Sequence, residues 1–144
     1  MPPLFTIGYE GKTQDEMVDE LEAAGVALVI DVRAVAASRR PGFSKTMLGN
    51  TLKKHGIEYL HLRALGTPKE GRIAARAGKI EKMHKIFEKQ LETPEAQLEL
   101  AHAKEIVGKR RAALLCFEAD AARCHRTIVA ERLYKSLGCK IENL

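Results

Sequence analysis

The feature that most constrains the fold is the apolar run at residues 26–32, Val-Ala-Leu-Val-Ile-Asp-Val, which only Asp31 interrupts. A strand with one solvated face alternates apolar and polar residues, whereas a strand buried on both faces of a parallel sheet reads as a continuous apolar run. Further strand-like segments lie at residues 4–8, 57–62, 112–117 and 141–144. The sequence therefore predicts a mainly parallel sheet of about five strands.

Helical patterns separate these strand-like segments. Thr13 and Glu16 have capping-box spacing, and Gly25 is suited to end the helix that they begin. The expected helices cover residues 13–25, 44–56, 80–91 and 93–108, with a last helix from about residue 122. Residues 65–72 have the composition of a loop. The alternation predicts an α/β fold, a single three-layer domain over residues 1–144 with helices on both faces of the sheet.

Composition limits the location and the partners. The chain has 144 residues, of which 45% are hydrophobic, and this is ordinary for a globular domain. The formal net charge of +5 suits an anionic ligand, but it equally suits a solvated basic surface. There is no secretory signal, and no apolar run approaches the ~18 residues that a membrane span needs. We expect a cytoplasmic protein with reduced thiols, no membrane partner and no disulfide scaffold.

Polar residues gather in the segments that follow the expected strands. In an open α/β sheet, ligands bind outside the carboxyl ends of the strands, where such segments meet. The candidates are Tyr9 and Glu10 after the first strand, Asp31, Arg33, Ser38 and Arg39 around the end of the second, and Cys116, Glu118, Arg123, Cys124, His125 and Arg126 around the end of the fourth. The sequence predicts that these residues form one site.

The arginines of this set predict an anion site. The guanidinium groups of Arg33, Arg39, Arg123 and Arg126 suit bidentate recognition of phosphate, although surface charge is the alternative. Arg123 and Arg126 are expected in the first turn of the last helix. The helix dipole disfavours cations there, unless an anion or a thiolate lies among them.

Three further residues are candidates for proton transfer. The carboxylates of Asp31 and Glu118 can move protons or orient the arginines, and His125 can act as an acid or a base. Asp31 interrupts an apolar run, so it can equally form a structural ion pair with Arg33. Glu118 can equally cap the helix that follows it.

Cys124 is the preferred nucleophile of the three cysteines, because a cationic first turn lowers the pKa of a thiol. The alternative is a small buried residue beneath the helix, and Cys116 is expected to pack within the sheet. A zinc site from Cys116, Cys124 and His125, with His61 as a fourth ligand, is not expected. The chain has no C-x-x-C or H-x-x-x-H pair, and adjacent helical residues project about 100° apart. No dinucleotide-binding or P-loop motif is present, so neither of these sites is supported, and the sequence leaves any cofactor unknown.

Several short motifs occur in chain order. They are Thr6-Ile7-Gly8-Tyr9, Asp31-Val32-Arg33 with Ser38-Arg39, Leu65-Gly66, and Cys116-x-Glu118 with Cys124-His125-Arg126. On these motifs the chain resembles the bacterial and archaeal family called domain of unknown function four-eight-eight. The resemblance implies an α/β fold and marks the motif residues as a site, but it implies no reaction. Ala36 departs from the family pattern, in which relatives often carry proline.

The run that ends in Asp31-Val32-Arg33 is also similar to the Asp-x-Arg strand of rhodaneses, which, like cysteine phosphatases, place a thiolate on a strand-to-helix anion loop. The leading prediction is nevertheless a hydrolase or group transferase for a small anionic or phosphate-bearing ligand, with a nucleotide or nucleic-acid component as the best guess. One alternative is a nucleic-acid-binding module without catalysis. The other is a thiol-based protein like a rhodanese or a phosphatase. The sequence does not indicate the oligomeric state.

Overall fold

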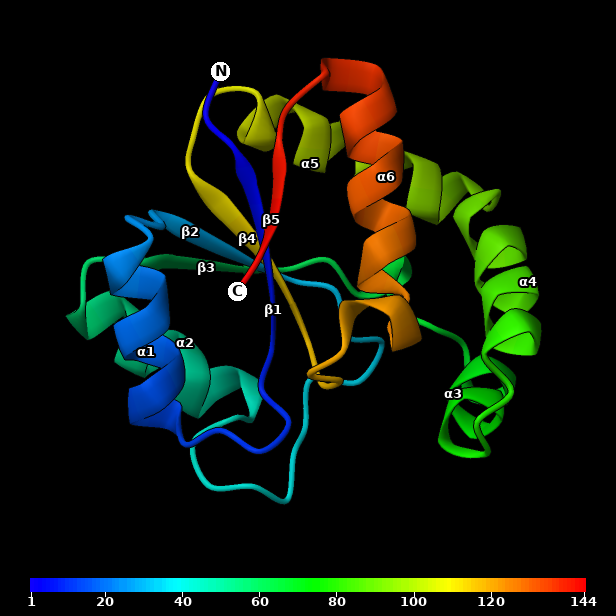
Figure 1. Ribbon diagram of the computed structural model, residues 1–144, viewed down its shortest axis with the longest axis horizontal. Helices are drawn as coiled ribbons and strands as arrows, with labels where there is room; N and C mark the ends of the chain where they lie inside the picture. The colour runs from blue at the N-terminus through cyan, green and yellow to red at the C-terminus, as the bar shows by residue number, and fades with distance from the viewer.

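The computed structural model describes all residues from Met1 to Leu144. Five strands form one sheet in which every pair is parallel, and their spatial order is β3-β2-β4-β1-β5 (Figure 1). The strands are β1 (Leu4–Gly8), β2 (Leu28–Asp31), β3 (Glu58–His61), β4 (Ala112–Cys116) and β5 (Ile141–Asn143). The predicted parallel sheet is confirmed. β2, β4 and β1 occupy its centre, and their residues are buried throughout.

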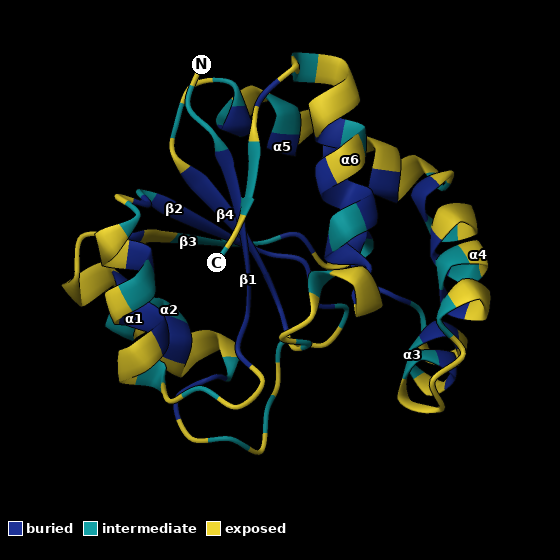
Figure 2. Cartoon of the chain, in the orientation of Figure 1, coloured by how far each residue is buried: buried dark blue, intermediate teal, exposed yellow.

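The chain forms six α-helices, of which all but α3 pack on the sheet. They are α1 (Gln14–Ala23), α2 (Lys45–Lys54), α3 (Lys69–Arg76), α4 (Ile80–Leu91), α5 (Pro94–Val107) and α6 (Arg126–Leu137). One hydrophobic cluster packs α1 and α2 on one face of the sheet, and a second packs α4, α5 and α6 on the other. Figure 2 shows that these helices turn their buried residues toward the sheet. The predicted layers on both faces are therefore confirmed.

Local sequence explains how the first helix begins. The Thr13 side chain accepts a hydrogen bond from the backbone N–H of Glu16 at 3.1 Å, and the Glu16 carboxylate accepts one from the N–H of Thr13 at 2.9 Å. This is the predicted capping box. Ser44 precedes α2 but its hydroxyl does not cap that helix, because it hydrogen-bonds the backbone of Ser38 instead.

Two helical segments differ from the sequence prediction. α3 covers residues 69–76, part of which was expected to be a loop; it is held in tertiary packing against α4. α6 begins at Arg126 and not near residue 122, because the Asp120 carboxylate caps a separate 3₁₀ turn (Ala121–Arg123) by accepting from the N–H of Ala122. Cys124 follows this turn with an extended backbone, at φ −123° and ψ 143°. The expectation that Arg123 and Cys124 lie in the first turn of the helix is therefore wrong.

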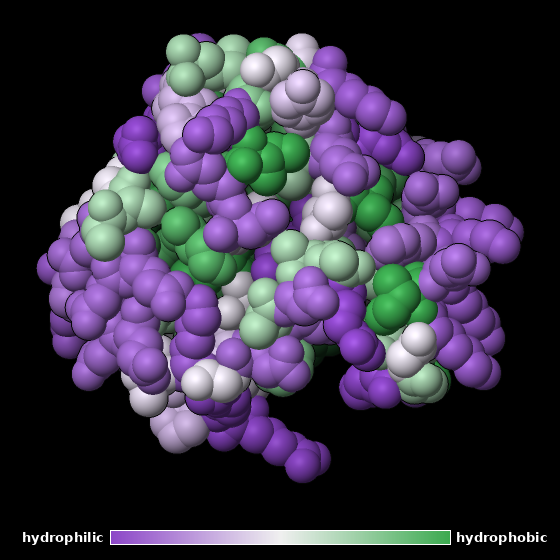
Figure 3. All heavy atoms as spheres, viewed as in Figure 1, coloured by the Kyte–Doolittle hydropathy of each residue, from purple (hydrophilic) through white to green (hydrophobic).

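The outer surface is mostly polar. In the view of Figure 3, hydrophilic residues cover most of the molecule and the apolar patches are separate from one another. Leu98, on α5, is the most exposed large apolar side chain, followed by that of Met1. None of the helices is both long enough and apolar enough to cross a lipid bilayer.

Candidate functional site

A cleft of about 830 Å³ opens at the carboxyl ends of the strands. Its walls come from the segments that follow β1, β2, β3 and β4, and α3 and α4 complete one side. The charged residues that line it are Glu10, Arg33, Arg72, Arg76, Glu118, Asp120 and Arg123. The four segments that follow the strands thus meet at one edge of the sheet, as expected for a parallel α/β fold.

Two glycines allow these segments to approach closely. A Cβ atom on Gly8 would lie 1.7 Å from the carbonyl oxygen of Glu118, and one on Gly66 would lie 2.1 Å from the backbone nitrogen of Ala34. The end of β1 therefore lies directly against the loop after β4, and the loop after β3 lies directly against the loop after β2. Only glycine leaves room for either contact.

Arg33 and Asp31 form a buried ion pair beside the cleft, with Nη2 2.7 Å from Oδ2. The guanidinium also donates to the Phe43 carbonyl at 2.8 Å and to the Tyr9 hydroxyl at 3.2 Å, while the Tyr59 hydroxyl donates to the Asp31 carboxylate. Burial alone would lower the pKa of Arg33, but the bond and charge of Asp31 outweigh it and hold that pKa above its usual value. Burial and the Asp31 charge raise the pKa of Tyr59. The geometry fits the alternative in which Asp31 forms a structural ion pair with Arg33.

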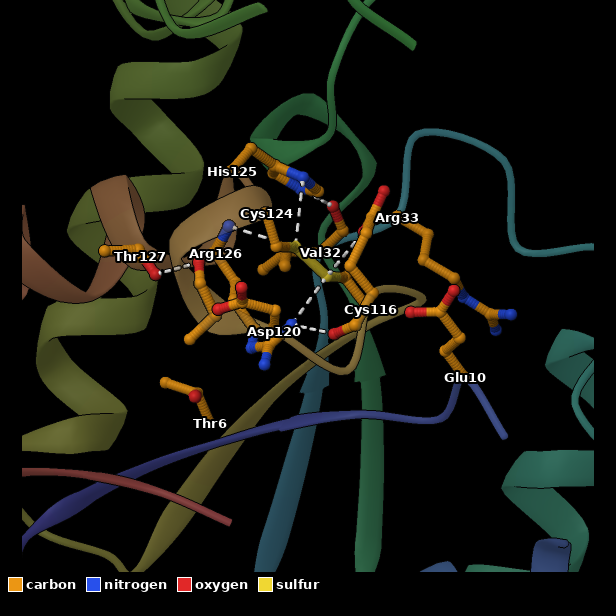
Figure 4. Close-up of a disulfide and its surroundings, with 12 residues drawn as sticks. Thr6, Glu10, Val32, Arg33, Cys116, Asp120, Cys124, His125, Arg126 and Thr127 are labelled. Atoms are coloured by element: carbon orange, nitrogen blue, oxygen red, sulfur yellow. Dashed lines mark hydrogen bonds between the residues drawn. A yellow bond between two sulfur atoms is a disulfide. The ribbon is translucent and has the colours of Figure 1, made fainter. Parts of the chain in front are cut away.

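Cys116 and Cys124 form a disulfide at the floor of the cleft (Figure 4). The expectation that all three cysteines are reduced is therefore wrong, and Cys139 is the one free thiol. The sequence gives no sign of this pairing, because it depends on the turn that folds the chain back after β4. Cys116 lines the cleft, whereas Cys124 is fully buried and does not.

The imidazole of His125 lies beside this disulfide in one defined tautomer. Nε2 is 2.7 Å from the carbonyl oxygen of Val32, and because a carbonyl only accepts, Nε2 carries the proton. Nδ1 therefore keeps its lone pair and lies 3.7 Å from the Cys124 sulfur. Burial lowers the pKa of His125 to about 4, so the ring is neutral near pH 7. Nδ1 and the sulfurs of Cys116 and Cys124 are the atoms best placed to hold a metal ion.

Arg126 is fully buried behind the disulfide and does not line the cleft. Its Nη1 donates to the Cys116 sulfur at 3.3 Å and to the Glu118 carbonyl, and its Nη2 donates to the Ala119 carbonyl at 3.3 Å. Nε has no partner, and no carboxylate lies within ion-pair distance. Burial lowers the pKa of Arg126. This side chain fixes the loop after β4 from below.

Glu118 is the half-buried carboxylate of the cleft. Its Oε2 atom lies 3.4 Å from the Cys116 sulfur. Burial raises the pKa of Glu118, the nearby Arg126 charge partly opposes the rise, and Glu10 adds to it. Glu10 is exposed, and its carboxylate accepts from the backbone N–H of Ala119 at 3.0 Å, which joins the loops after β1 and β4.

Three arginines line the cleft without a carboxylate partner: Arg72, Arg76 and Arg123. Arg72 donates to the Thr67 carbonyl at 2.9 Å, which holds its guanidinium near the cleft wall. The sequence prediction missed Arg72 and Arg76, because their segment looked like a loop. Their i, i+4 spacing was the available signal, since it places both side chains on one face of a helix.

The cleft does not include every expected residue. Ser38 hydrogen-bonds Ser44, and Arg39 is exposed; neither lines the cleft. Asp31, Cys124 and Arg126 are buried beneath or beside it. The expected residues that do line the cleft are Tyr9, Glu10, Arg33, Cys116, Glu118, Arg123 and His125.

Comparison with known proteins identifies the family. The family model described as Domain of unknown function DUF488 matches residues 13–133. Neither the curated proteins nor the solved structures give a match. The matched residues span most of the chain, and they include the C-x-E and C-H-R motifs around the cleft. The chain therefore belongs to the family described as domain of unknown function DUF488.

Proposed function

We propose that this protein is an enzyme, a hydrolase or a group transferase, which acts on a small phosphate-bearing substrate in the cleft. The observation that carries this proposal is the set of arginines without carboxylate partners, Arg72, Arg76 and Arg123, in the same cleft as Glu118. Guanidinium groups form paired, charge-assisted hydrogen bonds with phosphate oxygens. A cleft with unpaired guanidinium groups therefore favours a phosphate or a similar anion.

The carboxylates give this cleft a means of proton transfer. A group that donates a proton to a leaving oxygen works best when its pKa is close to the working pH. Burial moves the pKa of Glu118 in that direction. Glu118 is therefore the proposed general acid, and the arginines from α3 and from the turn before Cys124 are the proposed anion contacts.

The size and the lining of the cleft suit a nucleotide. Small-molecule sites commonly have volumes of roughly 300–1,000 Å³, and this cleft falls within that range at about 830 Å³. Phe117 lines it with 41% of its surface exposed, and its ring meets the Tyr9 ring edge-on at 5.3 Å. An exposed aromatic ring offers a face on which a nucleobase can stack.

Titration with inorganic phosphate and with a nucleoside monophosphate, followed by calorimetry, tests the binding. The expected result is saturable binding that Arg123→Ala or Arg76→Ala weakens by roughly tenfold to a hundredfold, the usual effect of losing a charged hydrogen bond. Arg132→Ala, on α6 and outside the cleft, is the matched control and should bind as the wild type does. Binding that is absent, or that neither cleft variant weakens, would contradict the proposal.

Turnover of a panel of phosphate esters tests the catalysis. Glu118→Gln should retain phosphate binding and lose most of the turnover, because an amide cannot donate the proton. A protein that binds nucleic acid with a steep salt dependence, turns over no ester and tolerates Glu118→Gln would instead be a binding module.

The disulfide favours a second candidate, a thiol-based transferase. In the reduced protein Cys116 would be its attacking sulfur, since it lines the cleft beside Glu118 and Arg126. Its test is the alkylation rate of the reduced protein at pH 7. A Cys116 thiol that reacts much faster than a small free thiol supports this candidate, and an equal or lower rate contradicts it.

A further inference from the structure

We propose that Cys116, Cys124 and His125 form a zinc site in the reduced protein, with a fourth coordination position that faces the cleft. From the sequence such a site was not expected, because the side chains of Cys124 and His125 would point in different directions if both residues lay in a helix. The structure removes that objection, since Cys124 has an extended backbone and precedes α6. Cys116 reaches the same point from the end of β4.

The spacing of Nδ1 and the Cys124 sulfur fits zinc, and the two sulfurs, which are bonded to each other in the disulfide, would have to move apart after reduction. The two sulfurs and Nδ1 of His125 all lie within 4.8 Å of one another (Figure 4). Nδ1 is 3.7 Å from the Cys124 sulfur; tetrahedral zinc, with bonds of about 2.3 Å to sulfur and about 2.0 Å to nitrogen, holds such a pair about 3.5 Å apart. The Cα atoms of the cysteines are 7.5 Å apart. Disulfide-bonded cysteines usually have Cα atoms roughly 4.4–6.8 Å apart, and a metal ion between the sulfurs suits the wider spacing.

His125 is oriented as a metal ligand. A histidine that ligates a metal through one nitrogen typically donates its other N–H to a carbonyl or a carboxylate. Here Nε2 donates to the Val32 carbonyl at 2.7 Å, which leaves the lone pair of Nδ1 directed at the sulfurs. The loop after β2 thus fixes the tautomer that zinc requires.

The surroundings of the two sulfurs suit thiolates. The backbone N–H of Arg126 donates to the Cys124 sulfur at 3.5 Å, and its Nη1 donates to the Cys116 sulfur at 3.3 Å. This guanidinium is fully buried and has no carboxylate partner. A buried charge is costly unless an opposite charge pairs with it. A disulfide carries no charge. Two thiolates balance the charge of a zinc ion, and a zinc-bound hydroxide then leaves the site with a net negative charge beside the guanidinium.

Formation of this site requires reduction of the disulfide. Two small thiols, or one dithiol, supply two electrons, break the S–S bond and become a disulfide themselves. The two cysteine thiols lose their protons to solvent when zinc binds. The disulfide and the zinc site are therefore alternative uses of the same two sulfurs.

The open position would give the cleft a nucleophile, and this step rests on the proposed function. Cys116 and His125 both line the cleft, so a zinc-bound water there would face the substrate. Zinc lowers the pKa of its water to near neutrality. The resulting hydroxide would attack phosphorus as the ester P–O bond breaks, and Glu118 would protonate the leaving oxygen. The next water molecule would restore the hydroxide by returning a proton to Glu118.

The test uses the full chain, reduced with a dithiol and then kept free of oxygen and reductant. Titration with Zn²⁺ should show one tightly bound ion per chain. Titration with Co²⁺ should give the ligand-field bands of tetrahedral cobalt and a sulfur-to-cobalt charge-transfer band that corresponds to two thiolates. Cys124→Ser should halve that band, and His125→Asn should weaken zinc binding at least tenfold. Cys139→Ser and His102→Asn are the matched controls and should change neither.

Three results would overturn the proposal: fewer than one zinc bound per reduced chain, an octahedral cobalt spectrum without a charge-transfer band, or an equal loss in the control variants. If a site variant fails to fold, the cobalt spectrum of the wild type still decides, because it counts the thiolates directly. If the cleft-arginine variants lose phosphate binding but bind zinc normally, the result concerns only the proposed function. If the site variants lose zinc binding but bind phosphate normally, the result concerns only the zinc site.

Discussion

Substitution of Gly8 by alanine tests the contact that brings β1 against the loop of the cleft. The new Cβ atom would lie 1.7 Å from the carbonyl oxygen of Glu118 and 2.9 Å from Nη1 of Arg126. Real Cβ atoms essentially never approach closer than 3.0 Å, so the carbonyl would have to withdraw by at least the difference, 1.3 Å. This movement breaks the hydrogen bond that the carbonyl accepts from Arg126.

The cost follows from these two effects. Overpacking of a tight core costs about 1–3 kcal/mol, and loss of a hydrogen bond from a charged donor costs about 1.5–3 kcal/mol. Together they give roughly 2.5–6 kcal/mol, a large share of the roughly 5–15 kcal/mol by which a domain of this size is stable. Gly49→Ala is the matched control, because its Cβ would meet Tyr59 at an ordinary 3.4 Å within α2. Alanine in a helix is favoured over glycine by about 1 kcal/mol, so this variant should be as stable as the wild type or more stable.

Urea unfolding followed by far-ultraviolet circular dichroism measures both variants. The expected result is a much lower midpoint for Gly8→Ala and an unchanged or higher one for Gly49→Ala. A Gly8→Ala protein within about 1 kcal/mol of the wild type would refute the close packing of β1 against the loop after β4.

Three further predictions concern single side chains. The pKa of His125 is lowered from 6.5 to about 4, so the unfolded chain binds more protons than the folded protein between these pH values. The free energy of unfolding should therefore fall by on the order of 3 kcal/mol as the pH drops from 6.5 to 4. Urea unfolding of His125→Asn over the same pH range should lack this dependence on pH. Asp31→Asn leaves the buried Arg33 guanidinium without its counter-charge and should cost about 3–5 kcal/mol in thermal melts, whereas a double variant that also carries Arg33→Met should recover part of the loss. Thr13→Ala removes the cap of α1 and should cost about 1 kcal/mol by urea unfolding; no loss would show that the capping box does not stabilise the helix.

Features with a local signal could be predicted from the sequence. Continuous apolar runs identified the buried strands, because only a strand covered on both faces tolerates them. Thr13 marked the start of its helix, since the cap is formed by residues within the same turn. The parallel order then brought Glu10 and Glu118, which are far apart in the chain, to one cleft.

Features that depend on tertiary contacts could not be predicted. The 3₁₀ turn that Asp120 caps sets the start of α6 four residues later than the apolar pattern indicates, and it turns Cys124 toward Cys116. α3 carries Arg72 to the cleft through its packing on α4, although its composition suggests a loop. Arg126 looked like an anion contact because of its place in the sequence, but the fold buries it under the loop.

The most direct test of the proposed anion site in the cleft is a crystal structure of the protein with tungstate, an oxyanion of phosphate shape that is located by its anomalous scattering. We expect a tungstate in the cleft, with oxygens within about 3 Å of the guanidinium nitrogens of at least two of Arg72, Arg76 and Arg123. Tungstate found only at surface lysines, with these three arginines free of it at a saturating concentration, would contradict anion binding in the cleft.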